Sequence, residues 1–385
     1  MIINKDVMRN NNERSVLQSI VNGGPISRNK ISKQLGLNKV TVSDIVGSFL
    51  DSKLIFSLGE AKSSTTSGRK PELVEYNSNY GYIVNFSISG RELNMLVTKM
   101  DGRTLEYNSK NIEKQSIKEI IAKMEDLLDQ LPDFDSDNGL QAISLSIYGI
   151  VYNGEIIVSP FTDFEDFDLV SHFQDKYQVP VVMENEANSS AIFEQDFSKQ
   201  EMQNIVTVSI HDGIGAGIII NTHLYRGNYG QAGEIGRIII QDSGKTKRKL
   251  AKLPSFDSEW SQTKILDKAA KLKKDTNYSL EKLVEDYNSH DSEIEELIED
   301  FCYHLAIITS DLIAAYDPQM IFFNSPLVDQ LPEILKILQM KLGFLPLVPP
   351  LVLSKDVKYG TLLGGASLAI HRVLQMEGTR LIFHH

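Results

Sequence analysis

Residues 27–50 read SRNKISKQLGLNKVTVSDIVGSFL, and they contain two short helical patterns that meet at a glycine. Ser27 can cap the first helix, and Gly36 can end it. Asn38 can cap the second helix, whose inner face carries apolar side chains three and four positions apart. Because only two residues separate the helices, they are expected to form the corner of a helix-turn-helix.

The second helix begins with side chains that suit contact with DNA. Lys39, Thr41 and Ser43 are small or basic and lie opposite the apolar face, and no acidic residue precedes Asp44 in this helix. A helix that enters a major groove needs such a first turn, because its N-terminal side chains reach base edges and its dipole favours phosphate. The pattern therefore predicts a recognition helix.

The flanking sequence completes a winged helix-turn-helix. Apolar residues at positions 16, 17, 20 and 21 indicate an earlier helix. Two short strands, 54–58 and 73–76, flank a polar loop that ends in Gly68-Arg69-Lys70-Pro71. Such a wing can place its two basic side chains on phosphates or in a minor groove. The DNA-binding residues predicted from helices and wing are Arg28, Asn38, Lys39, Thr41, Ser43, Arg69 and Lys70.

The charge distribution supports this prediction. The 385 residues carry a formal net charge of −12, which taken alone argues against a nucleic-acid partner. Residues 1–75, however, contain eleven Lys and Arg against seven Asp and Glu, a net charge of +4, so the remainder carries −16. A basic head on an acidic body suits a nucleic-acid module joined to another domain. The alternative is a small helical domain that binds protein or caps the body; the agreement of corner, first turn and wing favours DNA.

Composition excludes several other classes of protein. Cys302 is the single cysteine, which excludes an internal disulfide framework and a cysteine-rich zinc knuckle. The sequence contains no run of about 18 apolar residues. The first residues also lack the apolar core of a signal peptide. We therefore expect a cytoplasmic protein with no membrane partner.

From residue 76 onward, strand and helix patterns alternate, which predicts an α/β body large enough for two lobes with a cleft between them. The strand patterns at 82–89 and 93–99 predict a hairpin. A glycine-rich segment at 211–217 separates the strand patterns 205–210 and 218–220. A dinucleotide fingerprint requires a helix after its glycines, so this segment is predicted to be a turn between strands. Such a turn can bind phosphate through backbone N–H groups or can be a plain hairpin, and both interpretations stay open.

Several motifs in the body resemble those of one known family. The most specific is the run from Leu224-Tyr225-Arg226-Gly227 to QAGEIGR at 231–237, which is similar to G-x-x-G-x-A-G-E-I-G-H. MENEAN at 183–188 resembles E-N-D-A-N, IYGIV at 147–151 resembles a P-G-x-V turn, and 212–217 resembles a glycine hairpin. Over nearly its whole length the chain resembles the ROK family (repressors, open reading frames and sugar kinases). The head resembles that of the family's xylose and N-acetylglucosamine repressors, which places the likeness in the repressor branch.

This resemblance implies a domain organisation. Residues 1–76 would form the winged helix-turn-helix, and the rest an actin-like body of two lobes that close on a sugar. Residues 77–190 would form the first lobe, completed by a C-terminal helix at about 360–378. Residues 191–359 would form the second lobe.

The chain departs from the family's kinases at the positions that would hold ATP. Ser87-Ile88-Ser89-Gly90 replaces an aspartate-glycine phosphate turn, and Asn324-Ser325 replaces a glycine pair that lies against the nucleotide. A kinase needs a carboxylate in that turn to organise magnesium on the triphosphate. Glu186 replaces the catalytic aspartate and would displace a general base by about 1 Å. The departures together indicate a protein that is not an enzyme, has no catalytic residues and does not use ATP.

The family's zinc site is also missing from the sequence. Arg237 stands where the family has a histidine ligand, and 241–255 contains no cysteine in place of the family's three. Arginine does not ligate zinc, because it keeps its proton in proteins. We therefore expect no metal and no cofactor. A basic run at 245–252 replaces the knuckle; a solvated loop is the favoured interpretation, and a phosphate or partner contact is the alternative.

The resemblance also implies which residues hold a sugar. Carboxylates and amides suit this task, because they offer hydrogen-bond acceptors to neighbouring hydroxyls in fixed directions. For Arg237, two hypotheses stay open: an ion pair with Glu234 or Glu186, or contact with an anionic ligand such as a sugar phosphate. The predicted ligand-binding residues are Gly149, Asn185, Glu186, Glu234, Arg237 and Asp257.

These observations favour a transcriptional regulator, most simply a repressor, whose body senses a carbohydrate. Its expected partners are double-stranded operator DNA, a small carbohydrate effector and further copies of itself as a dimer or dimer of dimers, because palindromic operators require matched half-sites. One alternative is a sugar kinase with a fused DNA-binding head. Another is a regulator whose body binds no ligand and serves only for dimerisation.

Overall fold

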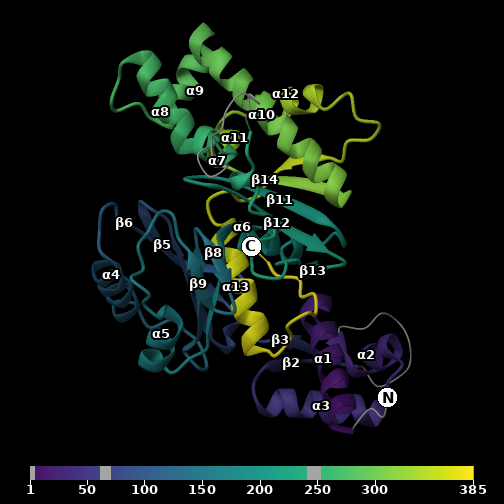
Figure 1. Cartoon of the computed structure of the whole chain (residues 1–385). Coiled ribbons are helices and arrows are strands. Elements are labelled where there is room, and N and C mark those ends of the chain that lie inside the picture. Colours follow the sequence, from purple (N-terminus) through teal and green to yellow (C-terminus); the bar gives the residue numbers. More distant parts are fainter. Residues whose placement is uncertain (1–4, 61–70, 241–252, 385) are drawn as a thin grey trace.

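The computed structural model describes residues 5–60, 71–240 and 253–384, which form a small head and a larger body of two lobes (Figure 1). Two predicted DNA contacts, Arg69 and Lys70, lie outside the described residues, as does the basic run at 245–252. No helix in the described ranges is both long enough and apolar enough to cross a bilayer.

The head contains three helices and a three-stranded antiparallel sheet of order β1-β3-β2. Its elements are α1 (Lys5–Gly23), β1 (Ile26–Ser27), α2 (Arg28–Leu35), α3 (Lys39–Asp51), β2 (Ile55–Glu60) and β3 (Glu72–Tyr76). The predicted helix ends are confirmed. Ser27 Oγ accepts a hydrogen bond from Lys30 N at 3.3 Å, and Asn38 Oδ1 accepts one from Val40 N at 2.9 Å. Gly36 ends α2 with a φ of 65°, a conformation that glycine adopts without strain.

The first lobe is built on a five-stranded mixed sheet of order β10-β7-β4-β5-β6. Its strands are β4 (Tyr82–Ile88), β5 (Glu92–Lys99), β6 (Thr104–Asn111), β7 (Leu140–Ile147) and β10 (Val181–Asn185). Further elements of this lobe are α4 (Ile117–Asp129), α5 (Leu169–Tyr177), a short 3-10 helix (Ser78–Tyr80) and the hairpin of β8 (Ile150–Tyr152) with β9 (Glu155–Val158). The predicted hairpin of β4 and β5 is confirmed, whereas β6 and α5 were not predicted.

The second lobe carries a five-stranded mixed sheet of order β13-β12-β11-β14-β15. Its strands are β11 (Ile205–Ile210), β12 (Ile214–Ile220), β13 (His223–Leu224), β14 (Met320–Asn324) and β15 (Leu351–Leu353). Its helices are η2 (Ile235–Arg237), α7 (Phe256–Trp260), α8 (Gln262–Lys273), α9 (Leu280–Asn288), α10 (Ser292–Tyr316), α11 (Pro326–Gln330) and α12 (Glu333–Lys341). The glycine-rich segment is a tight turn between β11 and β12, as predicted.

Two helices lie between the sheets (Figure 1). α6 (Glu186–Asp196) packs on β11 and β12 of the second lobe, whereas α13 (Gly360–Val373) packs on β4 and β7 of the first. The two helices pack directly against each other, and a Cβ atom at Gly364 would lie only 1.7 Å from the carbonyl oxygen of Ser189. A glycine is therefore required at this contact. Both helices begin at the gap between the lobes and run toward the head.

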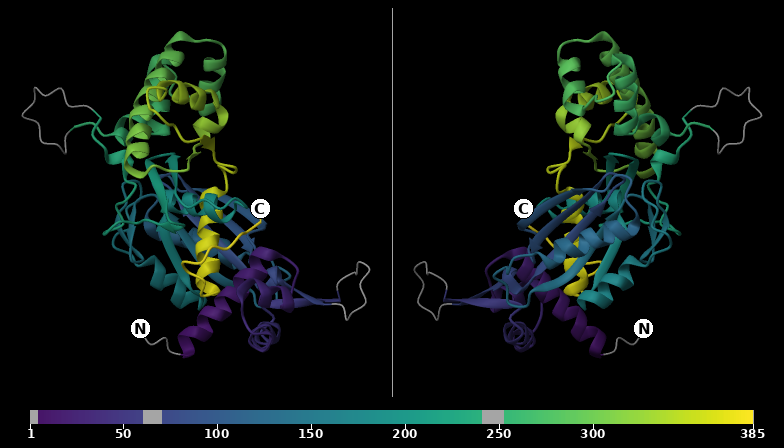
Figure 2. Two further views of the ribbon diagram at one scale, coloured as in Figure 1. Left: turned by 90° about the vertical axis from the view of Figure 1, so that its right-hand side faces the viewer. Right: turned by 90° about the vertical axis from the view of Figure 1, so that its left-hand side faces the viewer.

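Residues 376–384, which we call the C-terminal strap, follow α13 and join the head to the body. Asn22 of α1 donates from Nδ2 to the carbonyl of Arg380 at 3.1 Å and accepts at Oδ1 from the N–H of Ile382 at 2.8 Å. On the body side, the N–H of Phe383 donates to the carbonyl of Asp196, at the end of α6, at 2.9 Å. The head therefore sits beside the lower end of α13, at one end of the molecule (Figure 2).

Candidate functional site

A cavity of about 280 Å³ lies between the two lobes. It is bounded by the turn after β7, the start of α6, the turn between β11 and β12, and the η2 and α7 segments. All six residues predicted to bind a ligand line this one cavity, although they come from separate parts of the chain. They are Gly149, Asn185, Glu186, Glu234, Arg237 and Asp257.

The carboxylate of Glu186 is the most enclosed of these groups, with 5% of the residue exposed. One oxygen, Oε1, accepts hydrogen bonds from Ser209 Oγ at 2.6 Å and from Thr361 Oγ1 at 3.0 Å. Its other neighbours are Ser190 Oγ at 3.3 Å and His211 Nε2 at 3.7 Å. Since these partners belong to both lobes and to α13, Glu186 links the cavity to the framework of the body.

Asn185 shapes the start of α6. Its Oδ1 accepts a hydrogen bond from Asn188 N at 3.2 Å, which caps the helix, and its Nδ2 donates to the carbonyl of Gly149 at 2.5 Å. Neighbouring Glu184, which is buried, forms an ion pair with the exposed Arg226 at 2.7 Å. The side chain of Asn185 therefore holds the wall of the cavity in place and has little hydrogen-bonding capacity left for a ligand.

Glu234 and Asp257 are half-buried carboxylates that are not neutralised by the protein. Burial raises the pKa of Glu234, although the nearby Arg237 guanidinium opposes this shift. Burial also raises the pKa of Asp257 to about 6, with a backbone hydrogen bond from Ile214 as the main opposing interaction. The Oδ1 atom of Asp257 is buried and has no hydrogen-bond partner. Unsatisfied acceptors of this kind are suited to the hydroxyl groups of a ligand.

Arg237 is exposed at the edge of the cavity and forms no ion pair with Glu234 or Glu186. The structure therefore does not contain the ion pair, which was one of the two hypotheses for Arg237. Three carboxylates face one guanidinium in the cavity, so its charge balance is negative. A negative cavity disfavours an anionic ligand.

The positions that hold ATP in a kinase are occupied differently here. Ser89 Oγ accepts from the N–H groups of Arg91 and Glu92 at 3.2 and 3.0 Å and thereby closes the turn between β4 and β5. Asn324 Nδ2 donates to Ser190 Oγ at 2.7 Å. Across the described part of the chain, no three His, Cys, Asp or Glu side chains group as a metal site would require. The expected absence of a metal and of a nucleotide stays a prediction.

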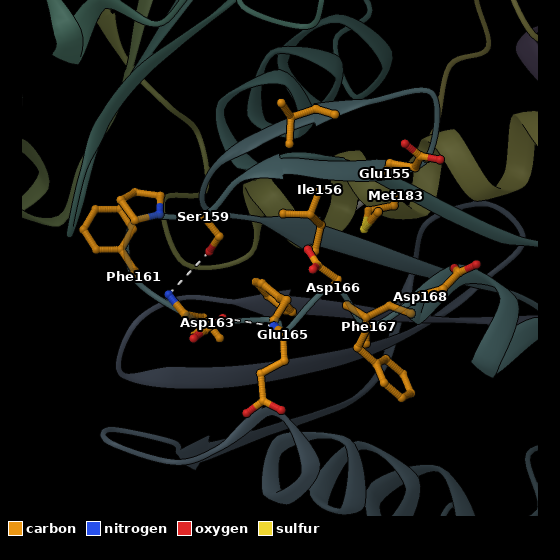
Figure 3. Close-up of a pocket in the computed structure, with 16 residues that line it drawn as sticks. Glu155, Ile156, Ser159, Phe161, Asp163, Glu165, Asp166, Phe167, Asp168 and Met183 are labelled. Carbon is orange, nitrogen blue, oxygen red and sulfur yellow. Dashed lines mark hydrogen bonds between the residues drawn. The ribbon is translucent and has the colours of Figure 1, made fainter.

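A second depression, of about 550 Å³, lies under the segment that leads from β9 to α5 (Figure 3). Sequence reasoning did not predict it, because an irregular loop has no hydrophobic period. Pro160 and Phe161 line both this depression and the cavity between the lobes. Figure 3 shows Phe161 turned away from the acidic side chains of the depression. Those acidic side chains are Glu155, Asp163, Glu165, Asp166 and Asp168.

In the head, the predicted DNA-binding residues have different surroundings. Lys39 and Ser43 are exposed on the first turns of α3, and Thr41 is half-buried. Asn38 is engaged in capping α3, and Arg28 pairs with Glu72 of β3 at 3.6 Å, which ties α2 to the wing strands. The prediction missed Val40, which is 65% exposed at the start of α3. The signal in the sequence was the apolar side chain of Val40 on the helix face that was predicted to contact DNA.

Two mixed sheets with a cavity between them and two helices packed across the gap define the class of protein. The chain belongs to the ROK family, whose sequence pattern matches residues 86–369. It is 34% identical over 384 residues to the xylose repressor of Lactiplantibacillus pentosus, covering 99% of this chain and 98% of that protein. It is 32% identical over 377 residues to the xylose repressor of Staphylococcus xylosus, covering 97% of each.

Solved structures show the same fold. A ROK family transcriptional regulator, a homolog of the Escherichia coli MLC protein, superposes with a TM-score of 0.78 at 20% identity and covers 95% of this chain and 96% of its own. A putative N-acetylmannosamine kinase from Listeria monocytogenes superposes with a TM-score of 0.64 at 24% identity, covering 77% of this chain and all of its own. The fold is thus shared by regulators and kinases, and the fold alone does not distinguish them.

Proposed function

We propose that this chain is a DNA-binding transcriptional repressor whose ROK body senses a sugar and alters operator binding. The observation that carries the proposal is the combination of a helix-turn-helix head with an interlobe cavity lined by hydrogen-bond acceptors. Similarity to xylose repressors of two organisms, over 97% or more of the chain, supports it. The proposal keeps the predicted domain division: 1–76 as the winged helix-turn-helix, 77–190 with about 360–378 as one lobe, and 191–359 as the other.

The head supplies the DNA contacts in this proposal. The first turn of α3 exposes Lys39 and Ser43 and leaves Thr41 partly accessible. The ion pair of Arg28 with Glu72 sets the wing strands against α2. A recognition helix with an accessible, non-acidic N-terminus fits a major groove, and the basic side chains fit phosphates.

The effector is proposed to be a neutral monosaccharide, with xylose as the first candidate because the similar repressors are named for it. Glu234 and Asp257 offer free acceptors for neighbouring hydroxyls, whereas a phosphorylated sugar would meet an excess of negative charge. Catalysis is not part of this function, because Glu186 is engaged by hydroxyl donors from both lobes. The proposal includes no metal and no nucleotide cofactor.

The partners of the proposed repressor include a second copy of the chain. Matched operator half-sites require two heads in a symmetric assembly. Helix α10, helix α12 and the loop after α12 expose large apolar side chains, and a set of this kind is typical of an interface between subunits. These side chains are Tyr303, Ile307, Met340, Phe344 and Leu347.

Selection of genomic DNA fragments by the purified full-length chain, with and without xylose, tests this function. A common palindromic sequence should be recovered, and xylose should reduce its recovery. Lys39→Glu should abolish recovery, whereas Glu234→Gln should preserve DNA binding and lose the response to sugar. Sugar-dependent ATP turnover would instead identify a kinase. Operator binding without any sugar-induced change in melting temperature would identify a ligand-blind regulator.

A further inference from the structure

One aromatic ring in the interlobe cavity has surroundings that the proposed function leaves unexplained. Phe161 belongs to the segment between β9 and α5, and its backbone is held near the turn after β4 by a hydrogen bond from Thr162 Oγ1 to the carbonyl of Ser89 at 3.2 Å. Its ring crosses from the first lobe to the second and ends beside Gly213, in the turn between β11 and β12. Figure 3 shows the ring of Phe161 turned away from the acidic side chains of the depression. The ring of Phe167, in the same segment, points in a different direction from the ring of Phe161.

Gly213 lets the edge of this ring approach the turn closely. A Cβ atom placed there would lie 3.0 and 3.1 Å from Cζ and Cε2 of Phe161 and 3.5 Å from Oδ1 of Asp257. The same Oδ1 atom is the buried acceptor without a hydrogen-bond partner. The edge of the aromatic ring and the free carboxylate oxygen therefore meet at Gly213 in the cavity wall, where a larger residue would crowd the ring.

This juxtaposition has the chemistry of a sugar subsite. A pyranose ring is amphipathic: its C–H groups form apolar faces, whereas its hydroxyls project from the edge. An aromatic side chain can cover the C–H groups while a carboxylate accepts a hydrogen bond from an adjacent hydroxyl. Asn185 and Glu186, which also line the cavity, are already engaged by the protein.

We propose that Phe161, Gly213 and Asp257 form a subsite for one C–H/O–H edge of a neutral pyranose, with the Phe161 ring as its apolar platform. This inference rests on the proposed function, because it assigns a specificity-determining role within the same sugar-binding cavity. It adds Phe161, which the sequence motifs did not indicate, to the residues proposed to bind the sugar. It also predicts that the sugar contacts both lobes at once, since Phe161 belongs to the first lobe and Gly213 to the second.

Two substitutions distinguish the contribution of the Phe161 ring to sugar affinity from that of the general shape of the cavity. Phe161→Leu keeps an apolar side chain but removes the ring, and xylose affinity measured by calorimetric titration should fall by about tenfold or more. Gly213→Ala places a methyl group 3.0–3.1 Å from the ring and so displaces it; because Gly213 is not among the residues with positive φ, the backbone tolerates alanine. This variant should also lose affinity.

Phe167→Leu is the matched control, since it removes an aromatic ring from the same segment outside the cavity. It should bind xylose as the wild type does. Saturation-transfer NMR supplies a readout that a merely structural role would not move: irradiation of aromatic protein protons should saturate the sugar C–H protons in the wild type and much less in Phe161→Leu. Wild-type affinity in both Phe161→Leu and Gly213→Ala would overturn the subsite and leave the repressor function intact. Absence of sugar binding by the wild-type chain would overturn both.

Discussion

Replacing Asp257 by asparagine should stabilise the protein in the absence of ligand and remove its response to sugar. The carboxylate is half-buried, its Oδ1 has no partner, and its opposing interactions are a backbone hydrogen bond from Ile214 and the more distant charge of Lys264. Asparagine preserves the shape of the side chain and an oxygen for the Ile214 N–H. It removes the charge that the cavity disfavours and replaces the free acceptor by an amide donor.

The expected magnitude follows from the raised pKa of Asp257, which moves from 3.8 to about 6. About two pKa units correspond to about 3 kcal/mol at most, and solvent screening of a half-exposed group reduces this to about 1–2 kcal/mol. Because the folded state favours the protonated form, stability is lost as the pH rises from about 4 to about 6, and the loss is complete above the folded-state pKa. Asp257→Asn should avoid that loss.

Differential scanning calorimetry at about pH 4 and about pH 7.5 tests this reasoning. At the higher pH the variant should melt about 2–5 °C above the wild type, and at the lower pH the two should coincide. Saturating xylose should raise the melting temperature of the wild type but not of the variant. Asp166→Asn, an exposed carboxylate of the second depression, is the control and should leave the pH dependence unchanged. A variant less stable than the wild type at both pH values would refute the reasoning.

Three further outcomes are expected. Val40 is expected to contact the methyl group of a thymine in the operator, so Val40→Ala should weaken operator binding about fivefold. Replacing that thymine by deoxyuracil should weaken binding by the wild type but not by the variant. Asn22→Ala removes two hydrogen bonds between α1 and the C-terminal strap, worth about 2 kcal/mol, so operator binding should become less sensitive to xylose while xylose affinity persists. Met340→Glu and Phe344→Glu should convert a dimer into monomers in sedimentation experiments; an unchanged sedimentation coefficient would exclude this face as the interface.

The helical corner of the head was predictable because its signals are local. Ser27, Gly36 and Asn38 are capping residues at the spacing of two short helices, and local hydrogen bonds fix these boundaries in the structure. The hairpin of β4 and β5 was predictable for the same reason, since its residues are adjacent in the chain. The net charge of +4 over residues 1–75 supported the prediction that the head binds DNA.

The parts that sequence reasoning missed depend on contacts between distant residues. Every residue of α6 is buried, so this helix has no amphipathic period that would mark it. The six residues of the cavity were brought together by motif resemblance and not by spacing, and the engagement of Asn185 with Gly149 could not be read from the sequence. Phe161 lies in an irregular loop, and only the folded chain places it opposite Gly213.

The late position of the C-terminal strap in the sequence has a consequence for folding during translation. Asn22 pairs with residues about 360 positions later in the chain, which leave the ribosome long after α1. The helices of the head can form early, since their caps are local, but the contacts between α1 and the strap cannot form until the strap has been synthesised. A nascent or prematurely terminated chain therefore lacks these hydrogen bonds, and its head is held to the body only by the contacts that lie earlier in the sequence.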